Sequence, residues 1–401
     1  MELYDSLKPM LPAGLIGPDY CHMVEKWLDA DAERAKEVKN TLSNWILRMK
    51  ELKASDIDFG APGSMNKVWY RIYGVKKPCL EYGSLETHES TAIILSWLSS
   101  TNRQTLYMNR SVDFSLDLSQ ENAPARFRGT VYFERGFVSC NFRRINDTLY
   151  TIEGLGIPKQ VSDKLNLKHQ KSGLVLVTGI TGSGKSTTLD AIIDMNNREN
   201  EAHIVIIGHP IEHIHKSKLC LVRHREVGPD VRSFEAGAIE ALRQDPDIIV
   251  VGEMRDPRTI ATVLEITDSG HKAFTTLHTS SAIDSLHRIV AEFPPDEQER
   301  IRNRLADVLT VSISQKLVPT IDSKLVLAKE ILVVDSSVQA AIRNQNIGEI
   351  YQMMVEGKKQ GMFTLEQDLL ELTRKRIISP NNAVNYSNNK KRMIQLLNNM
   401  L

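Results

Sequence analysis

The amino-acid sequence predicts an α/β protein in which a smaller α+β domain precedes a domain built on a parallel sheet. The chain has 401 residues, which is more than the roughly 250 to 300 residues that a single hydrophobic core usually holds. From Leu174 onward, short apolar segments without alternating polarity are separated by longer segments in which apolar residues recur at helical spacing. This pattern is typical of parallel strands that helices cover on both faces.

The first 145 residues mix helical and strand patterns. Apolar residues recur at helical spacing in Asp29–Leu52, and Thr87–Leu98 is a second expected helix. Val68–Tyr73 is rich in aromatic and β-branched residues, as strands are. Further strands are expected at Asp113–Leu118, Arg126–Phe133 and Phe137–Arg143. We therefore expect a helical extension over residues 1–50 and an α+β domain over residues 51–145.

The second domain is expected over residues 161–401, after a connecting segment at residues 146–160. Its expected strands are Leu174–Thr178, Ile204–Ile207, Ile248–Val251 and Ala273–Leu277. The tail from about Pro294 is expected to be mostly helical. Its expected helices are Asp296–Lys316, Gln339–Asn344, Ile347–Glu356 and Thr364–Arg374.

The composition argues against several classes of function. Lys and Arg total 50 residues and balance 50 Asp and Glu residues, so we expect no direct binding of nucleic acid. The absence of a C-x-x-C pair argues against zinc and against a disulfide framework. The four scattered cysteines are Cys21, Cys79, Cys140 and Cys220. Since no apolar run reaches about 18 residues and the first residues do not read as a signal peptide, we expect a cytoplasmic protein.

The segment from Gly179 to Thr187 contains the phosphate-binding pattern G-x-x-x-x-G-K-S. It follows a buried-type strand and opens a helical pattern, which distinguishes a true phosphate-binding loop (P-loop) from a chance match. In such loops, backbone N–H groups and a helix N-terminus surround the phosphates. Lys185 is expected to bind the β- and γ-phosphates, and the Ser186 hydroxyl to bind Mg²⁺. The expected ATP-binding residues are Gly179, Ile180, Thr181, Gly182, Ser183, Gly184, Lys185, Ser186 and Thr187.

A carboxylate follows the expected strand Ile248–Val251. Glu253 stands where the apolar run stops, at the carboxyl end of a strand, where ligands of parallel sheets bind. We expect Glu253 to activate or orient water, either directly or through the metal ion. Asp247, at the start of the same strand, is expected to be structural.

Several segments in order resemble the PilT/GspE family of secretion ATPases. Leu242–Asp256 resembles the Walker B region of the family, and Ser269–Thr279 resembles its His box. Pro210–Glu212 lies within the segment that corresponds to the family's Asp box. Further matching segments are Arg225–Gly228, Phe293–Pro294, Ile313–Leu317 and Gly361–Thr364. The chain length and the missing C-x-x-C pair favour the PilT/DotB-like branch.

The resemblance implies a PAS-like N-terminal domain, a RecA-like P-loop ATPase domain with a helical C-terminal part, and a homohexameric ring. It implies that ATP and Mg²⁺ are bound and that Glu212 is the remaining acid of the Asp box. The resemblance implies that His278 is a γ-phosphate sensor or an inter-subunit relay, and His271 is a second candidate for this role. Arg135 and Arg143 resemble arginines that reach the phosphates, a role that suits the guanidinium group.

One departure from the family pattern concerns turnover. Gly208 and His209 stand where the family usually has Glu-Asp. Either Glu253 and Glu212 suffice for activating water, or hydrolysis is slow or depends on a partner.

The main functional hypothesis is a hexameric ATPase that converts hydrolysis into mechanical work for a type IVB secretion or conjugative-transfer apparatus. The nearest alternative is a type IV pilus retraction ATPase. An alternative of another class is a nucleotide-gated docking platform that hydrolyses little ATP. In each case the expected partners are other copies of the chain and the inner-membrane and cytoplasmic components of the machine, so the protein would be peripheral at the inner membrane through them.

Overall fold

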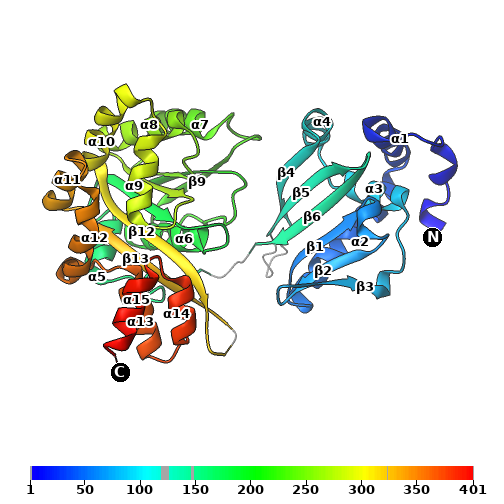
Figure 1. The fold of residues 1–401 in the computed structure, drawn as a ribbon. Coiled ribbons are helices and arrows are strands. Elements are labelled where there is room, and N and C mark those ends of the chain that lie inside the picture. The colour runs from blue at the N-terminus through cyan, green and yellow to red at the C-terminus, as the bar shows by residue number, and fades with distance from the viewer. Residues whose placement is uncertain (1, 119–125, 146–148, 323, 401) are drawn as a thin grey trace. The chain divides into compact units, whose positions relative to one another are not determined.

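The computed structural model describes residues 2–118, 126–145, 149–322 and 324–400 (Figure 1). The chain divides into two compact units, Met1–Asp147 and Thr148–Leu401. Residues 146–148, at the start of the expected connecting segment, lie outside the described residues. Ile152 and Ile157, further along that segment, are buried in the core of the second unit.

In the described part of the N-terminal unit, six strands form one sheet in the order β3-β2-β1-β6-β5-β4. The strands are β1 (Ala54–Gly60), β2 (Val68–Ile72), β3 (Val75–Cys79), β4 (Ser111–Asp117), β5 (Arg126–Glu134) and β6 (Phe137–Arg144). The helices are α1 (Gly17–Asp29), α2 (Ala32–Glu51), α3 (Thr87–Leu95) and α4 (Ser100–Asn109). Trp27 of α1, Ile46 of α2 and Phe59 of β1 belong to one core, so the leading helices pack on the sheet.

In the second unit, residues 149–322 and 324–400 contribute seven strands to one sheet, in the order β13-β12-β7-β11-β10-β8-β9. The strands are β7 (Gly173–Thr178), β8 (His203–Gly208), β9 (Leu221–Glu226), β10 (Ile248–Val251), β11 (Lys272–Leu277), β12 (Leu309–Pro319) and β13 (Leu325–Val333). All neighbouring pairs are parallel except β12 and β13. Every residue of β7, β10 and β11 is buried. This explains the almost uninterrupted apolar sequences of β7 and β10, whereas β11 also buries Lys272, Thr275 and Thr276.

Helices cover the second sheet (Figure 1). They are α5 (Lys159–Leu165), α6 (Lys185–Glu199), α7 (Phe234–Ala241), α8 (Pro257–Asp268), α9 (Ala282–Ala291), α10 (Pro295–Val308), α11 (Ser336–Arg343), α12 (Ile347–Glu356), α13 (Leu365–Arg374), α14 (Pro380–Tyr386) and α15 (Lys390–Asn398). The last three helices pack beside the β12–β13 hairpin around a smaller core that includes Val318, Leu369 and Met393. The predicted α/β class, with an N-terminal sheet domain and a parallel-sheet domain, is confirmed.

The expected helix Asp296–Lys316 is wrong beyond Val308. Helix α10 ends there, and the chain continues as β12, which pairs with β7 from Leu309 to Ser314. The segment contains β-branched residues that favour a strand, and a place beside β7 buries them. The expected helix Asp29–Leu52 is also shorter, because the Asp31 side chain accepts hydrogen bonds from two backbone N–H groups and caps α2 at its start.

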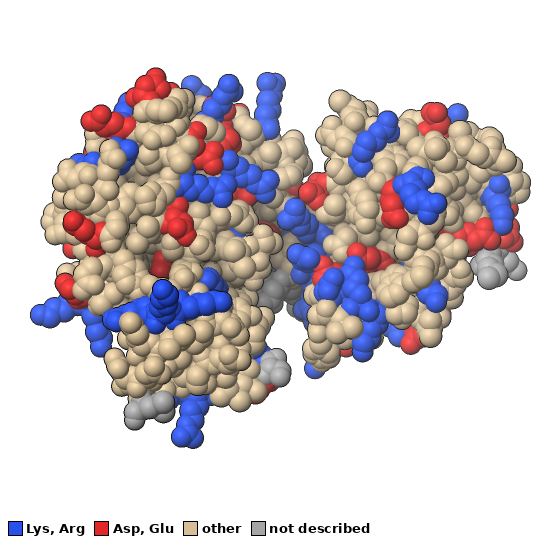
Figure 2. Space-filling view, in the orientation of Figure 1, with Lys and Arg blue, Asp and Glu red and all other residues tan. Residues whose placement is uncertain are grey.

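The surface and the helices add two further observations. On the face shown in Figure 2, basic and acidic side chains lie among one another in both units, in keeping with equal totals of the two signs. Among the described residues, no helix is both long enough and apolar enough to cross a membrane.

Candidate nucleotide-binding site

The loop from Gly179 to Gly184 joins the carboxyl end of β7 to the first turn of α6. Gly179, Gly182 and Gly184 have φ angles of +151°, +79° and +86°, which side chains other than glycine rarely tolerate. A Cβ atom on Gly179 would also lie 2.3 Å from Ser183 Oγ and 2.5 Å from the backbone oxygen of Gln315. The loop therefore requires glycine at these positions, and it ends on a helix N-terminus suited to anions.

Lys185 is buried at the start of α6, with 9% of its surface exposed. Its Nζ atom donates hydrogen bonds to the backbone oxygens of Gly179 at 2.8 Å and Ile180 at 3.1 Å. Burial lowers the pKa of Lys185, and the carboxylates of Glu253 and Glu212 oppose that shift. The ammonium group is therefore held inside the loop, with two carboxylates of the predicted site in its electrostatic surroundings.

Glu253 and His278 follow the carboxyl ends of neighbouring strands. Glu253 Oε2 lies 2.6 Å from Arg255 Nε and 3.5 Å from His278 Nε2. Burial and the charge of Lys185 lower the pKa of His278, and Glu253 raises it. Because the net shift is downward, His278 is expected to be neutral near pH 7. The structure thus places Lys185, Glu253 and His278 near one another at the carboxyl ends of the strands, and their catalytic roles stay predictions.

The segment after β8 contains Glu212 and the departure at Gly208 and His209. Glu212 interacts electrostatically with Lys185, whereas His209 Nδ1 lies 3.1 Å from the backbone oxygen of Val227. A Cβ atom on Gly208 would lie 2.9 Å from Ile211 Cγ1. A larger residue at position 208 would therefore require the segment to shift.

Residues 31–395 match the type II/IV secretion system protein family. The chain belongs to this family. The twitching motility protein of Neisseria gonorrhoeae is 38% identical over 310 residues, which are 77% of this chain and 81% of the relative. The type IV pilus retraction ATPase PilT of Pseudomonas aeruginosa is 39% identical over 302 residues, which are 75% of this chain and 85% of PilT.

Two solved structures extend the comparison to the fold. The pilus retraction motor PilT with bound ADP is 37% identical, has a TM-score of 0.78, and the alignment covers 87% of this chain and 98% of PilT. The ATPase DotB of Legionella pneumophila has a TM-score of 0.68 at 23% identity, over 93% of this chain and 96% of DotB, and shows a shared fold. This secretion-family ATPase therefore has the predicted RecA-like domain and a nucleotide-binding P-loop.

The predicted Mg²⁺ ligands of the secretion-family ATPase are oxygen donors. Ser186 lies in the first turn of α6, and Glu253 follows β10. No group of three or more His, Cys, Asp or Glu side chains that could hold a metal ion occurs among the described residues. The two predicted oxygen donors suit Mg²⁺, which usually takes one or two protein ligands and completes its shell with phosphate oxygens and water.

The predicted arginines of the secretion-family ATPase lie in the N-terminal unit, at opposite ends of the β5–β6 hairpin. Arg135 occupies the turn with a φ angle of +53°, whereas Arg143 is near the end of β6 and its Nε lies 2.8 Å from Asp56 Oδ1. Eight residues of strand span about 25 Å. The hairpin therefore does not bring the two arginines together, and their role at the phosphates stays a prediction.

His271 lies at the amino end of β11, whereas His278 lies at its carboxyl end. It precedes β11, and its Nδ1 atom is 3.0 Å from Ser269 Oγ. Seven residues of extended chain separate the two histidines by roughly 23 Å. The structure therefore does not bring His271 to the P-loop.

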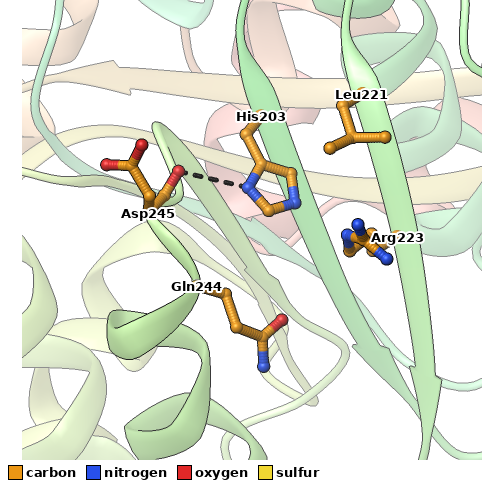
Figure 3. Close-up of a pocket in the computed structure, with 5 residues that line it drawn as sticks. All are labelled: His203, Leu221, Arg223, Gln244 and Asp245. Atoms are coloured by element: carbon orange, nitrogen blue, oxygen red, sulfur yellow. Dashed lines mark hydrogen bonds between the residues drawn. The ribbon is translucent and has the colours of Figure 1, made fainter.

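A cavity of about 520 Å³ also lies on the side of the sheet where the parallel strands begin, beside the amino ends of β8 and β9. His203 from β8 and Leu221 and Arg223 from β9 line one side, and Gln244 and Asp245 line the other (Figure 3). The strands are parallel, and the P-loop lies at their carboxyl ends. The cavity is therefore separate from the nucleotide site.

Sequence reasoning assigned no role to Gln315, which contacts the P-loop from β12. Its Nε2 atom donates a hydrogen bond to the backbone oxygen of Ser183 at 2.8 Å. The segment Ile313–Leu317 matches the family pattern, but its expected helical conformation gave no reason to place Gln315 beside the loop. One signal in the sequence could have identified Gln315. It is a polar amide that lies between the apolar residues Ile313 and Val318.

Proposed function

We propose that this chain is an Mg²⁺-dependent ATPase that drives retraction of a type IV pilus. The observation that carries the proposal is the cluster of Lys185, Glu253 and His278 at the carboxyl edge of the parallel sheet. A buried cation, a carboxylate and a neutral imidazole beside a P-loop provide the groups that phosphoryl transfer to water needs.

The proposed reaction is hydrolysis of the γ-phosphate. Lys185, already confined by loop carbonyls, neutralises charge on the phosphates. Glu253 accepts a hydrogen bond from the attacking water and draws its proton, a role supported by the position of its carboxylate near His278 and in the electrostatic surroundings of Lys185. His278 is neutral and can donate one hydrogen bond and accept another. When bound, Mg²⁺ neutralises phosphate charge, with the Ser186 hydroxyl and the Glu253 carboxylate as its proposed protein ligands.

Arginines of an N-terminal unit are proposed to complete the site within a homohexameric ring. The Arg143 side chain is 61% exposed although it pairs with the buried Asp56, so its guanidinium can form further contacts. Arg135 stands on the opposite end of the hairpin. It is therefore proposed to contact another part of the assembly or another phosphate group.

The choice of pilus retraction over secretion or conjugation depends on the relatives. PilT of Pseudomonas aeruginosa and the twitching motility protein of Neisseria gonorrhoeae are 39% and 38% identical over three quarters of this chain, whereas DotB is 23% identical. The main functional hypothesis from the sequence, a type IVB or conjugative ATPase, is therefore less well supported than its alternative. The proposed partners are inner-membrane components of the pilus machine, through which the protein would act at that membrane.

Pilus retraction is tested by complementation. In a strain that lacks this gene and has a fluorescently labelled pilus, the wild-type chain is expected to restore retraction events, and the Glu253→Gln chain is not. Restored secretion or plasmid transfer without any effect on retraction would overturn the assignment in favour of a secretion or conjugation motor.

The docking-platform alternative retains one supporting observation, the replacement of the acid pair by Gly208 and His209. The two functions differ in turnover. ATP hydrolysis measured over a range of protein concentrations, with Glu253→Gln as the blank, is expected to rise faster than linearly with concentration as rings form. Tight ATP binding with a rate equal to the Glu253→Gln blank at every concentration would favour the platform.

A further inference from the structure

Strand β12 lies directly beside the strand that leads into the P-loop. It is parallel to β7, with Val311 opposite Val175 and Ser314 opposite Thr178. The hydroxyls of Ser314 and Thr178 are 2.7 Å apart, so the two strands are also joined through their side chains. The next residue of β12, Gln315, therefore stands beside the first glycine of the loop.

Gln315 approaches the loop at its start, near its end and at its last glycine. Its backbone oxygen would lie 2.5 Å from a Cβ atom on Gly179. Its Nε2 atom donates to the Ser183 oxygen at 2.8 Å and would lie 3.3 Å from a Cβ atom on Gly184. Gln315 is 2% exposed and Ser183 is 2% exposed, so water does not compete freely for this hydrogen bond.

The hydrogen bond fixes the orientation of one peptide group in the loop. In a trans peptide, the carbonyl oxygen and the following N–H point in opposite directions. When Gln315 holds the Ser183 oxygen toward β12, the N–H of Gly184 is directed away from β12. P-loops bind phosphate through inward-pointing N–H groups of this kind.

Packing does not explain why this position is an amide. Gln315 Oε1 is buried and has no hydrogen-bond partner among the described residues. A buried polar atom left unpaired costs free energy, and an apolar side chain of similar size would fill the space without that cost. The donor function of Nε2 toward the loop therefore distinguishes glutamine from an apolar residue here.

We propose that Gln315 is a positioning residue that holds the Ser183–Gly184 peptide in the orientation that binds phosphate. The inference rests on the proposed ATPase function, since ATP is the ligand that the loop would receive. It assigns a role in nucleotide affinity to β12, a strand outside the segments that form the P-loop and the Glu253–His278 site.

Two variants test the donor function. Gln315→Met keeps the length of the side chain but cannot donate, and the KM for ATP is expected to rise about fivefold to tenfold, the range for one lost hydrogen bond. Gln315→Glu can donate to the Ser183 oxygen only while its carboxyl group is protonated. Its KM relative to wild type is therefore expected to rise as pH increases from about 5.5 to 8.5.

Ser312→Ala is the matched control. Ser312 is a buried residue of the same strand, and its Oγ has no hydrogen-bond partner among the described residues. Its removal should leave KM within about twofold of wild type. Thermal unfolding of all variants distinguishes altered affinity from a loss of folded protein.

The outcomes separate this inference from the proposed function. If wild type hydrolyses no ATP, the proposed function fails, and the same comparison is made with the Kd of a fluorescent ATP analogue. If Gln315→Met binds ATP like Ser312→Ala, or if the pH profile of Gln315→Glu parallels that of wild type, Gln315 has no positioning role. The wild-type profile serves as the reference because Lys185 and His278 also titrate in the site.

Discussion

Nε2 of His278 lies 3.5 Å from Oε2 of Glu253, across the carboxyl ends of the adjacent strands β11 and β10. The two side chains are 25 residues apart in sequence, and only the parallel pairing of these strands brings them together. The same edge carries Lys185, whose charge contributes to the lowered pKa of His278. The contact links the predicted water-activating carboxylate to the predicted phosphate sensor.

Replacement of Glu253 by glutamine should abolish turnover without abolishing nucleotide binding. The change keeps the size of the side chain but removes its ability to take a proton, so kcat is expected to fall about 100-fold to 10,000-fold. The control is Glu265→Gln on α8, which removes a largely exposed carboxylate that pairs with Arg304. A Glu253→Gln rate within a factor of two of the control would rule out the role of Glu253.

The pKa of His278 should be lower than the ordinary histidine value of about 6.5. Burial is the largest cause, and the positive charge of Lys185 adds to it. The neutral ring should therefore persist until the pH falls below about 6.5, and only then should protonation reduce turnover. NMR titration of the imidazole protons measures this directly. Glu253→Gln should lower the pKa further, since it removes the carboxylate that stabilises the imidazolium, and an upward shift would contradict the geometry.

Asn388 should connect the C-terminal helices to the loop after His278. Its Nδ2 atom donates to the Ser280 oxygen at 3.1 Å, and its Oδ1 atom accepts from Lys316 Nζ at 2.6 Å. Asn388→Ala should weaken the packing of α14 and α15 against the rest of the second unit by about 1 to 3 kcal/mol. Hydrogen exchange of these helices should speed up before that of β7, with Asn381→Ala as the control. Uniform acceleration in both regions would mean that the contact has no local role.

The stability of the second unit should depend on the protonation of Glu330. This side chain accepts a hydrogen bond from the backbone N–H of Ala282, and burial raises its pKa to about 7, with smaller contributions from the carboxylates of Glu366 and Asp284. A folded-state pKa above the ordinary value means that the stabilisation is complete below about pH 4.5 and is lost as the pH rises through about 7.

Glu330→Gln should remove that dependence. Between pH 4.5 and pH 7.5, the free energy of unfolding of the variant should gain up to about 3 kcal/mol relative to wild type. Denaturant unfolding at several pH values measures the difference. A constant difference across that range would show that Glu330 ionises normally in the folded protein.

The sequence predicted those parts of the site that short segments encode. The P-loop depends on the spacing of Gly179, Gly184 and Lys185 and on the apolar strand before it, and all of these are local features. Glu253 was identifiable because it ends an apolar run. Buried parallel strands lack alternating polarity, which is why β7, β8, β10 and β11 were predicted near their observed bounds.

Other parts depend on pairings between distant segments. Strand β12 alternates poorly because polar Ser312, Ser314 and Gln315 are all buried beside β7, so its sequence reads as a continuation of α10. Strand β9 (Leu221–Glu226) is largely charged and, within the described part of the chain, pairs only with β8 as the edge strand of the sheet. The strand patterns around Arg135 and Arg143 were clear, but only the hairpin register shows how far apart the two residues lie.

The central claim, ATP hydrolysis at this P-loop, is tested most directly by steady-state phosphate release from purified wild-type chain and Lys185→Ala. The control is Lys171→Ala, which removes an exposed cation just before β7. Wild type and the control are expected to release phosphate at similar rates. Lys185→Ala should be slower by at least about 100-fold, because a preorganised charge at the phosphates is lost. Equal rates in all three proteins would contradict the account.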